Sequence, residues 1–391
     1  MHQNIPVVMY HSVGLPKKDW MWDFLTIPYG LFEDHIRCLR SKGFVPIDFK
    51  EYYAHVRFGA ELPERCVFLH FDDGYLDNWV FAYPILRKYG FKGTIFVNPE
   101  FVDPALDPRP NLDDVWKGRA EIEDLTPHGF LSWAEMRAME QEGVMDIQSH
   151  AMTHTWYFSG PEIVDFRHPG DSYVWMDWNE NPEEKWAYLS ADPASRPSRM
   201  GSPVYAHGKS LEVRRFFPDE RLSRHLEAHV ESRGPTFFDR PDWKSELHAL
   251  AGEFRSTNRL HESTESEEEY IRRMHWELGE SKRILESRLS KEVDLLCWPG
   301  GGYDSGAVEI SKQYYLATTL ASRERKRGVP LMDGDHVRVE RIGCPHVVRK
   351  GRVEYTNGRY LYHFMREYQG SGSSRLVRKF LKLFKLIWGI G

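Results

Sequence analysis

The residues of this chain best suited to chemistry are two adjacent carboxylates, Asp72 and Asp73, which end the apolar run 67–71 and precede Gly74. In α/β folds active sites lie at the carboxyl ends of strands, so a strand that delivers Asp-Asp into a turn is typical of an active site. Neighbouring residues on a strand point to opposite faces. Both carboxylates can therefore reach one site only where the strand has ended and the backbone bends, which Gly74 permits because it lacks a Cβ. Taken alone, Asp-Asp-Gly is equally consistent with an Asx-type turn.

Two histidines spaced four apart, His150 and His154, follow the predicted strand 144–148. At the end of a strand or on a first helical turn, two imidazoles at this spacing can bind one ion. With a carboxylate from a neighbouring strand they form a set of two histidines and one carboxylate, which leaves positions open for water and substrate. An isolated pair of this kind is commonly two unrelated surface histidines. The combination with Asp-Asp at the preceding strand end favours the metal site.

Short apolar runs alternate with segments of helical spacing over the first 150 residues. This alternation predicts a mainly parallel α/β sheet or barrel. The first run ends at His11, which on its own would be interpreted as a structural histidine. The predicted strands are 6–10, 44–47, 67–71, 93–97 and 144–148.

Three motifs resemble those of the polysaccharide deacetylase family (NodB homology, carbohydrate esterase family 4): Tyr10-His11, Phe71-Asp72-Asp73-Gly74 and Ser149-His150 with His154. The resemblance spans roughly residues 5–155, resumes at about 266–345, and is closest to the branch that deacetylates N-acetylglucosamine polymers. It implies a distorted (β/α) barrel and a divalent metal, most often zinc, with nickel, cobalt or manganese as alternatives.

The resemblance also implies roles for individual residues. We expect Asp73, His150 and His154 to hold the metal and Asp72 to be the general base that takes a proton from water. Arg341, in an Arg-Ile pair, resembles an element near the end of the same branch. We expect it to keep Asp72 ionised, because a nearby positive charge favours the carboxylate form.

Two motifs depart from the family pattern. The stretch from Pro299 to Tyr303 resembles the third motif, but Gly300 stands where an aromatic residue is usual and the preceding basic residue is absent. Its three glycines let the backbone approach a ligand, so we expect an oxyanion donor near Gly300, with Pro299 and Tyr303 beside the substrate. The family's C-terminal Leu-x-His motif has no clean match. His346 is the nearest substitute, and His346 or His11 is the candidate acid for the leaving amine.

We expect residues 1–368 to form the barrel, with 155–262 as an insertion. The insertion is rich in Pro, Arg and Trp, and lacks the periodicity of a barrel repeat. Because it follows the metal histidines, it should lie over the mouth of the site. It either contacts substrate as a lid or only braces the barrel.

The C-terminal region predicts a flexible linker, 369–374, and then a basic amphipathic helix, 375–391. The helix carries five Lys and Arg and no acidic residue, and removing those charges from the net charge of −6 leaves −11 for the rest of the chain. Such a helix is typical of a membrane interface, so we expect peripheral membrane contact through 375–390. The alternative is a helix docked on the barrel.

Composition narrows the class further. The net charge of −6 argues against nucleic acid as the main partner. The four cysteines form no C-x-x-C pair, so buried thiols are expected. The sequence shows no secretory signal and no apolar run of about 18 residues, which predicts a cytoplasmic protein, peripheral on the inner face of the cell membrane.

These features predict a metal-dependent hydrolase that removes the N-acetyl group from an amino sugar in a glycan or a lipid-linked glycan precursor, and releases acetate. The predicted location favours the lipid-linked precursor over a finished polymer. Ring opening of cyclic amides or ureides on the same fold is an alternative reaction. A glycan-binding protein with a vestigial metal site is the non-enzymatic alternative, and the altered third motif is the feature in its favour.

Overall fold

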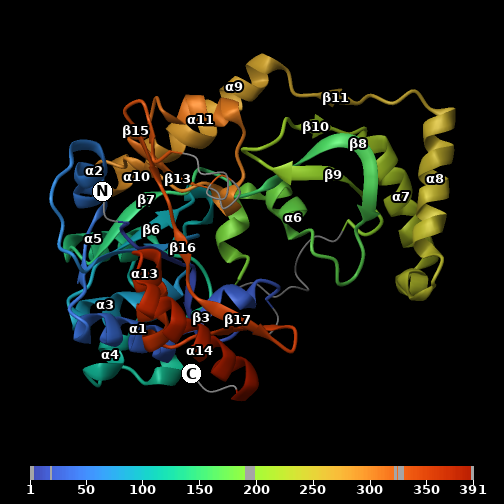
Figure 1. Ribbon diagram of the computed structural model, residues 1–391. Coiled ribbons are helices and arrows are strands. Elements are labelled where there is room, and N and C mark those ends of the chain that lie inside the picture. Colours follow the sequence, from blue (N-terminus) through green and yellow to red (C-terminus); the bar gives the residue numbers. More distant parts are fainter. Residues whose placement is uncertain (1–3, 18–19, 190–198, 321–323, 325–329, 389–391) are drawn as a thin grey trace.

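The computed structural model describes residues 4–17, 20–189, 199–320, 324 and 330–388 (Figure 1). A ten-stranded sheet runs through the molecule in the order β14-β15-β13-β12-β7-β6-β5-β1-β16, with β4 paired to β5. All of its pairings are parallel except β14 with β15. The strands are β1 (Val7–Tyr10), β4 (Val45–Pro46), β5 (Cys66–Phe71), β6 (Gly93–Val97), β7 (Met145–Ser149), β12 (Leu295–Leu296), β13 (Ala317–Thr319), β14 (Met332–Asp333), β15 (His336–Val339) and β16 (Ile342–Gly343).

Strand β5 shows why these segments form a parallel sheet. All six of its residues are buried, as expected for a strand covered on both faces. Leu69 and Phe71 pack toward the surrounding helices, whereas Phe68 packs against Phe96 and Leu295 in a separate interior cluster. The predicted α/β class with a parallel sheet is therefore confirmed.

The sheet curls until its two edges nearly meet. Strands β15 and β16 lie near opposite ends of the strand order, yet only Glu340 and Arg341 connect them. This connection can span no more than about 11 Å. The sheet is thus a distorted barrel, and Arg341 lies at its seam.

Helices cover the outside of the barrel and extend into an arm and a tail (Figure 1). The capping box of Ser132 with Glu135 begins α5. The helices are α1 (Tyr29–Ser41), α2 (Phe49–Phe58), α3 (Tyr83–Tyr89), α4 (Leu112–Trp116), α5 (Trp133–Gln141), α6 (Val174–Glu180), α7 (Glu220–Arg233), α8 (Trp243–Thr257), α9 (Glu267–His275), α10 (Ser281–Leu289), α11 (Ser305–Ser311), α13 (Gly358–Tyr368) and α14 (Gly372–Trp388).

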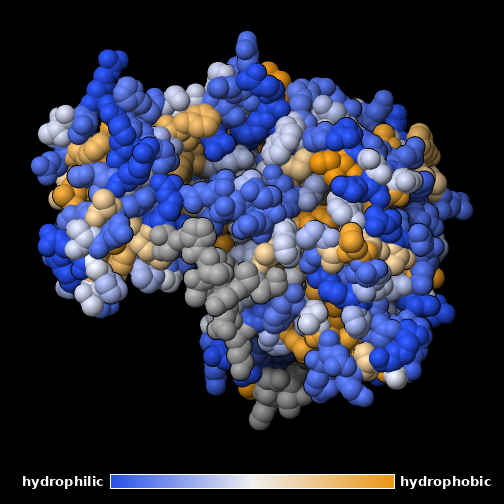
Figure 2. Space-filling model, turned by 180° about the vertical axis from the view of Figure 1, so that it is seen from behind, coloured by the Kyte–Doolittle hydropathy of each residue, from blue (hydrophilic) through white to orange (hydrophobic). Residues whose placement is uncertain are grey.

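The insertion predicted at 155–262 forms an arm beside the barrel. Its base is the antiparallel pair β8 (Trp156–Phe166) and β9 (Pro203–Lys209), and its far end has a small core of its own around Phe166, where α7 and α8 pack. The chain returns through β11 (Ser263–Thr264), paired with β10 (Phe216–Phe217). Figure 2 shows the arm from behind, standing away from the barrel, with a mostly hydrophilic surface.

Two short sheets flank the site end of the barrel. Strand β2 (Ser12–Gly14) pairs with β3 (Thr26–Pro28), and β17 (His346–Arg349) forms a hairpin with β18 (Arg352–Tyr355).

The tail differs from the prediction in one respect. The linker predicted at 369–374 is shorter, because α14 begins at Gly372 and only 369–371 connect it to α13. The Ser371 hydroxyl accepts a hydrogen bond from the Ser374 backbone N–H, and this N-terminal cap favours the start of α14 at Gly372. Within the described residues, no helix combines the length and the apolar character needed to cross a bilayer.

Candidate metal centre

A cavity of about 350 Å³ opens at the carboxyl ends of the parallel strands. Each of the strands β1, β5, β6, β7 and β12 contributes residues to its wall from the segment that follows the strand. These residues are His11, Asp72, Asp73, Asn98, His150, His154 and Gly300. The arrangement follows the general rule that α/β folds place chemistry at this end of the sheet.

The two adjacent carboxylates reach the cavity because the backbone turns between them. Asp72 continues the inward-facing series of β5 after Phe68 and His70, since alternate residues share a face. Asp73 has left the strand, with a positive φ of 74° that non-glycine residues rarely adopt. The bend predicted from Gly74 thus already begins at Asp73.

Asp73, His150 and His154 converge on one point. The Nε2 atoms of His150 and His154 each lie 3.1 Å from the same Asp73 oxygen, Oδ1. Metal–ligand bonds of about 2.0–2.2 Å bring ligand atoms to separations near 3 Å. The three side chains are therefore spaced as ligands of one ion.

The hydrogen bonding of His150 fits a metal ligand. Its Nδ1 lies 2.7 Å from the backbone carbonyl of Cys297, which can only accept. The proton is therefore on Nδ1, and the lone pair of Nε2 points toward the Asp73 carboxylate. A neutral imidazole whose Nε2 lone pair faces a carboxylate is the form that binds a metal, so the residues present fit a divalent metal.

The loop that carries the two histidines is held from behind. Ala151 and His154 both have a positive φ, of 59° and 44°. Five non-glycine residues among those described have a positive φ, and three of them, Asp73, Ala151 and His154, lie at this site. The carboxylate of buried Glu277 accepts hydrogen bonds from the backbone N–H groups of Met152 and Thr153, both at 3.2 Å. It also accepts one from the Thr153 hydroxyl at 2.6 Å. These bonds offset the cost of the unusual backbone at the site.

Two further residues hold the same loop. The Asn98 amide donates to the carbonyls of His150 and Ala151. Lys185, from the arm, donates to the Thr153 carbonyl at 3.0 Å and pairs with Glu100. Sequence reasoning missed Asn98, Lys185 and Glu277. Only Asn98, which directly follows a predicted strand, carried a local signal.

Asp72 and Arg341 form a buried ion pair at the seam of the barrel. Arg341 Nη1 lies 2.6 Å from Asp72 Oδ1, and the side chains are 10% and 5% exposed. Burial alone would raise the pKa of Asp72, but the positive charge of Arg341 and the nearby His11 and His150 lower that pKa overall. Asp72 is therefore held as a carboxylate, as predicted for a general base.

The remaining lone pairs of Asp72 face two other groups. His11 Nε2 lies 3.8 Å from Asp72 Oδ2, and the Cys297 thiol lies 3.6 Å from the same oxygen. Asp72, His150 and Cys297 form a second possible ligand set. Burial raises the pKa of Cys297 well above its usual value, so the thiol stays protonated and is the poorer ligand.

The third motif is arranged differently from the prediction. The Gly300 backbone lines the cavity, but its carbonyl accepts a hydrogen bond from the Lys209 ammonium of the arm. Pro299 is buried beneath it. The ring of Tyr303 packs on Trp298, with ring centres 4.5 Å apart, and its hydroxyl bonds Glu324, so Tyr303 does not line the cavity.

His346 also lies outside the cavity. It begins β17 with an exposed side chain, and its Nδ1 is 3.2 Å from the Cys344 carbonyl. It lines a separate pocket of about 250 Å³ that shares His11 with the site. Of the two candidate acids, the structure places only His11 beside Asp72.

Aromatic side chains form the walls of the site cavity. Three come from the predicted insertion, Trp156, Trp178 and Tyr188, so this segment does contribute to the mouth of the cavity. The barrel side contributes Trp22, Phe24, Tyr75, Phe101 and Phe130, and the Trp22 and Trp178 ring centres lie 5.9 Å apart. Flat apolar rings of this kind suit the faces of sugar rings.

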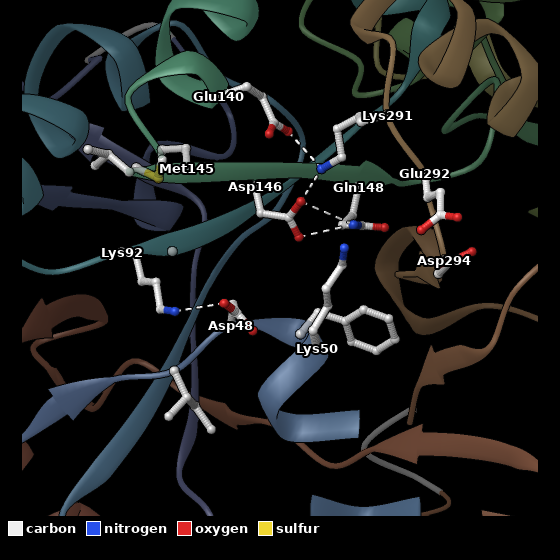
Figure 3. Close-up of a pocket in the computed structure, with 15 residues that line it drawn as sticks. Asp48, Lys50, Lys92, Glu140, Met145, Asp146, Gln148, Lys291, Glu292 and Asp294 are labelled. Carbon is white, nitrogen blue, oxygen red and sulfur yellow. Dashed lines mark hydrogen bonds and ion pairs between the residues drawn. The ribbon is translucent and has the colours of Figure 1, made fainter. Parts of the chain in front are cut away.

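A second cavity, of about 370 Å³, lies at the opposite end of the strands (Figure 3). Lys291 there points between Glu140 and Asp146, and Lys92 pairs with Asp48 at 2.7 Å. The two lysines are thus ion-paired within the wall of this cavity. In barrel folds this end serves stability, so we assign the chemistry to the other cavity.

The fold and the site together define a curled, mainly parallel α/β barrel with a candidate metal-binding set of one aspartate and two histidines. Residues 59–188 match the polysaccharide deacetylase family model.

Two curated proteins show the same similarity. The YxkH protein of Bacillus subtilis (strain 168) is 31% identical over 151 residues, which are 39% of this chain and 43% of that protein. The poly-beta-1,6-N-acetyl-D-glucosamine N-deacetylase of Escherichia coli (strain K12) is 23% identical over 155 residues, 40% of this chain and 21% of that enzyme. The chain thus matches less than half the length of either relative.

Among solved structures, a de-N-acetylase from Aggregatibacter actinomycetemcomitans aligns with a TM-score of 0.49 and 18% identity, covering 86% of this chain and 94% of that one. IcaB from Ammonifex degensii aligns with a TM-score of 0.45 and 14% identity, covering 88% and 92%.

Proposed function

We propose that this protein is a metal-dependent hydrolase that removes the N-acetyl group from an N-acetylated amino sugar and releases acetate. The observation that supports this most directly is the convergence of Asp73, His150 and His154 next to the buried Asp72–Arg341 pair. An aromatic cavity surrounds them, and residues 59–188 match the polysaccharide deacetylase family model.

In this proposal the residues of the chain divide the proton transfers between them. Asp72, kept ionised by Arg341, takes a proton from the water that attacks the acetamide carbon. His11, on the same side of the cavity, gives a proton to the leaving amine. A metal held by Asp73, His150 and His154 would supply Lewis acidity to the acetamide carbonyl and to water.

The donor set favours zinc, which binds two histidines and one carboxylate in catalytic sites with a position left open. Nickel, cobalt and manganese also accept imidazole and carboxylate ligands, so they are alternatives for the same site.

For the substrate we propose an N-acetylglucosamine-type sugar in a glycan or a lipid-linked precursor, acted on at the inner face of the cell membrane. The Escherichia coli relative is named for an N-acetylglucosamine polymer, and the aromatic walls of the cavity fit sugar rings. Contact through residues 375–390 would bring the enzyme to lipid-linked substrates.

The proposal is tested by acetate release from N-acetylglucosamine oligomers and from a polyprenyl-diphosphate-linked N-acetyl sugar. The protein is first stripped with a chelator and then reloaded with zinc. We expect release that disappears on stripping and returns on reloading. Metal uptake without release from either substrate would instead favour a glycan-binding protein. Opening of a cyclic ureide in the same assay would favour the alternative hydrolase.

A further inference from the structure

Helix α14 docks on the barrel through its polar face. Arg378 forms an ion pair with Glu367 of α13 and donates to the Tyr360 hydroxyl at 3.1 Å. Ser374 and Lys385, on the same side of the helix, are 6% and 7% exposed. The alternative of a docked helix is therefore correct for this face.

The apolar face of α14 points away from the protein. Residues three and four apart share one side of a helix, and here they form a single stripe. Its side chains are Leu376, Phe380, Leu383, Phe384 and Ile387, which are 69%, 66%, 57%, 42% and 60% exposed. A helix that only braced a barrel would bury this stripe and expose its cations.

Cations border the stripe along one side. Arg375, Lys379 and Lys382 are exposed and lie, in helical projection, between the docked face and the apolar stripe. The helix carries five Lys and Arg and no acidic residue. The whole chain has a net charge of −6, so the rest of the chain without these five positive charges has a net charge of −11. Arg375 lies 3.8 Å from Glu367 of α13, and the exposed cations together complement an anionic surface.

The same side of the molecule continues to the mouth of the site cavity. Helix α14 contacts β17, where Val348 is 61% exposed. Tyr355, on the partner strand β18, donates to the Phe24 carbonyl at 2.9 Å. Phe24 lines the site cavity and is half exposed. Figure 1 shows α14, β17 and β3 gathered at one end of the barrel.

We propose that the outward stripe of α14, its bordering cations, Val348 and Phe24 form one surface that rests on a bilayer containing anionic lipids. The apolar side chains enter the headgroup region, the cations meet lipid phosphates, and the cavity opens close to the bilayer. A sugar carried on a lipid would then reach the metal centre without leaving the membrane. That consequence rests on the proposed deacetylase function, whereas the membrane contact does not.

The test is co-sedimentation of the full chain with phosphatidylcholine vesicles, with and without phosphatidylglycerol. We expect binding only to the anionic vesicles, weakened by salt, and a loss of roughly tenfold or more in the variant L376Q/F380Q/I387Q. The matched control is Phe58→Gln on α2, which replaces an apolar side chain that is 72% exposed at another place on the barrel. This variant should bind like the unmodified protein.

Three outcomes would overturn the inference: no binding to anionic vesicles, equal binding by the triple variant, or a dimer in solution that the triple variant dissociates. The last would make the stripe a contact between copies of the chain. Acetate release from soluble oligomers by the triple variant keeps the two proposals apart. We expect the triple variant to release acetate from soluble oligomers at the same rate as the unmodified protein. If the unmodified protein released no acetate, this would count against the proposed deacetylase function and not against the membrane contact.

Discussion

Lys209 of the inserted arm lies against Gly300 at the rim of the metal centre and donates a hydrogen bond to its carbonyl. A Cβ on Gly300 would lie 2.6 Å from the Lys209 Nζ. Gly300 also has a positive φ of 51°, which other residues rarely adopt, so the backbone conformation and the neighbouring lysine both favour glycine at this position of the third motif.

The same contact predicts the effect of Gly302→Ala. The backbone of Gly302 suits alanine, with a φ of −95°, but the new Cβ would lie 2.8 Å from the Lys209 Cβ. We expect a loss of about 1–3 kcal/mol in the free energy of unfolding, measured with urea. Gly252→Ala in α8 is the control, since no atom lies within 4 Å of its new Cβ. It should be neutral or stabilising, and equal effects of the two changes would contradict the steric explanation.

Asp72→Asn should separate chemistry from metal binding. The amide keeps the shape of the side chain but cannot take a proton, so kcat should fall by about two to four orders of magnitude. Zinc affinity, measured by calorimetry, should change little. Asp73→Asn, the adjacent control, should lower zinc affinity instead. Full turnover by Asp72→Asn would refute the assignment of the base.

The pH dependence should depend on Arg341. Asp72 works as a carboxylate, so activity is present above its pKa in the folded enzyme and is lost as the pH falls through that pKa. Because Arg341 lowers this pKa, Arg341→Gln should move the acid limb of the kcat/KM profile to higher pH. Arg341→Lys keeps the positive charge and should shift the acid limb of the profile less. An unmoved limb in both variants would mean that another group titrates there.

The free energy of unfolding should also depend on pH through the ionisation of Asp72. A carboxyl whose folded pKa is depressed stabilises the protein above its unfolded pKa of about 3.9, and this contribution is lost as the pH falls through the folded value. The stability difference between the unmodified protein and Asp72→Asn should therefore shrink on acidification below about pH 4. Urea titrations at a series of pH values measure it, and a constant difference would contradict the ion-pair argument.

Glu277 should affect the metal without contacting it. Glu277→Gln replaces one acceptor oxygen by a donor facing the backbone N–H groups of the loop that links His150 and His154. We expect zinc affinity to fall by about 10–100-fold, as for other residues that orient ligands. Glu268→Gln, exposed on α9, is the control. A lower melting temperature with unchanged zinc affinity would make Glu277 a purely structural residue.

The sequence by itself determined the strand pattern, Asp72 and Asp73 after one strand, and the spacing of His150 and His154. These are local properties, because a strand followed by a polar turn presents its side chains in nearly the same way in any parallel sheet. The nearness of the two motifs follows from the adjacency of β5, β6 and β7 in the sheet.

Only the tertiary structure decided which distant residues meet these ligands. Arg341 reaches Asp72 across 269 positions because the sheet curls until its two edges nearly meet, whereas His346, only five residues further on, lies on a separate hairpin. Tyr303 turns toward Trp298, and Lys209 fills the space beside Gly300. Such contacts depend on the packing of whole elements, which local spacing does not specify.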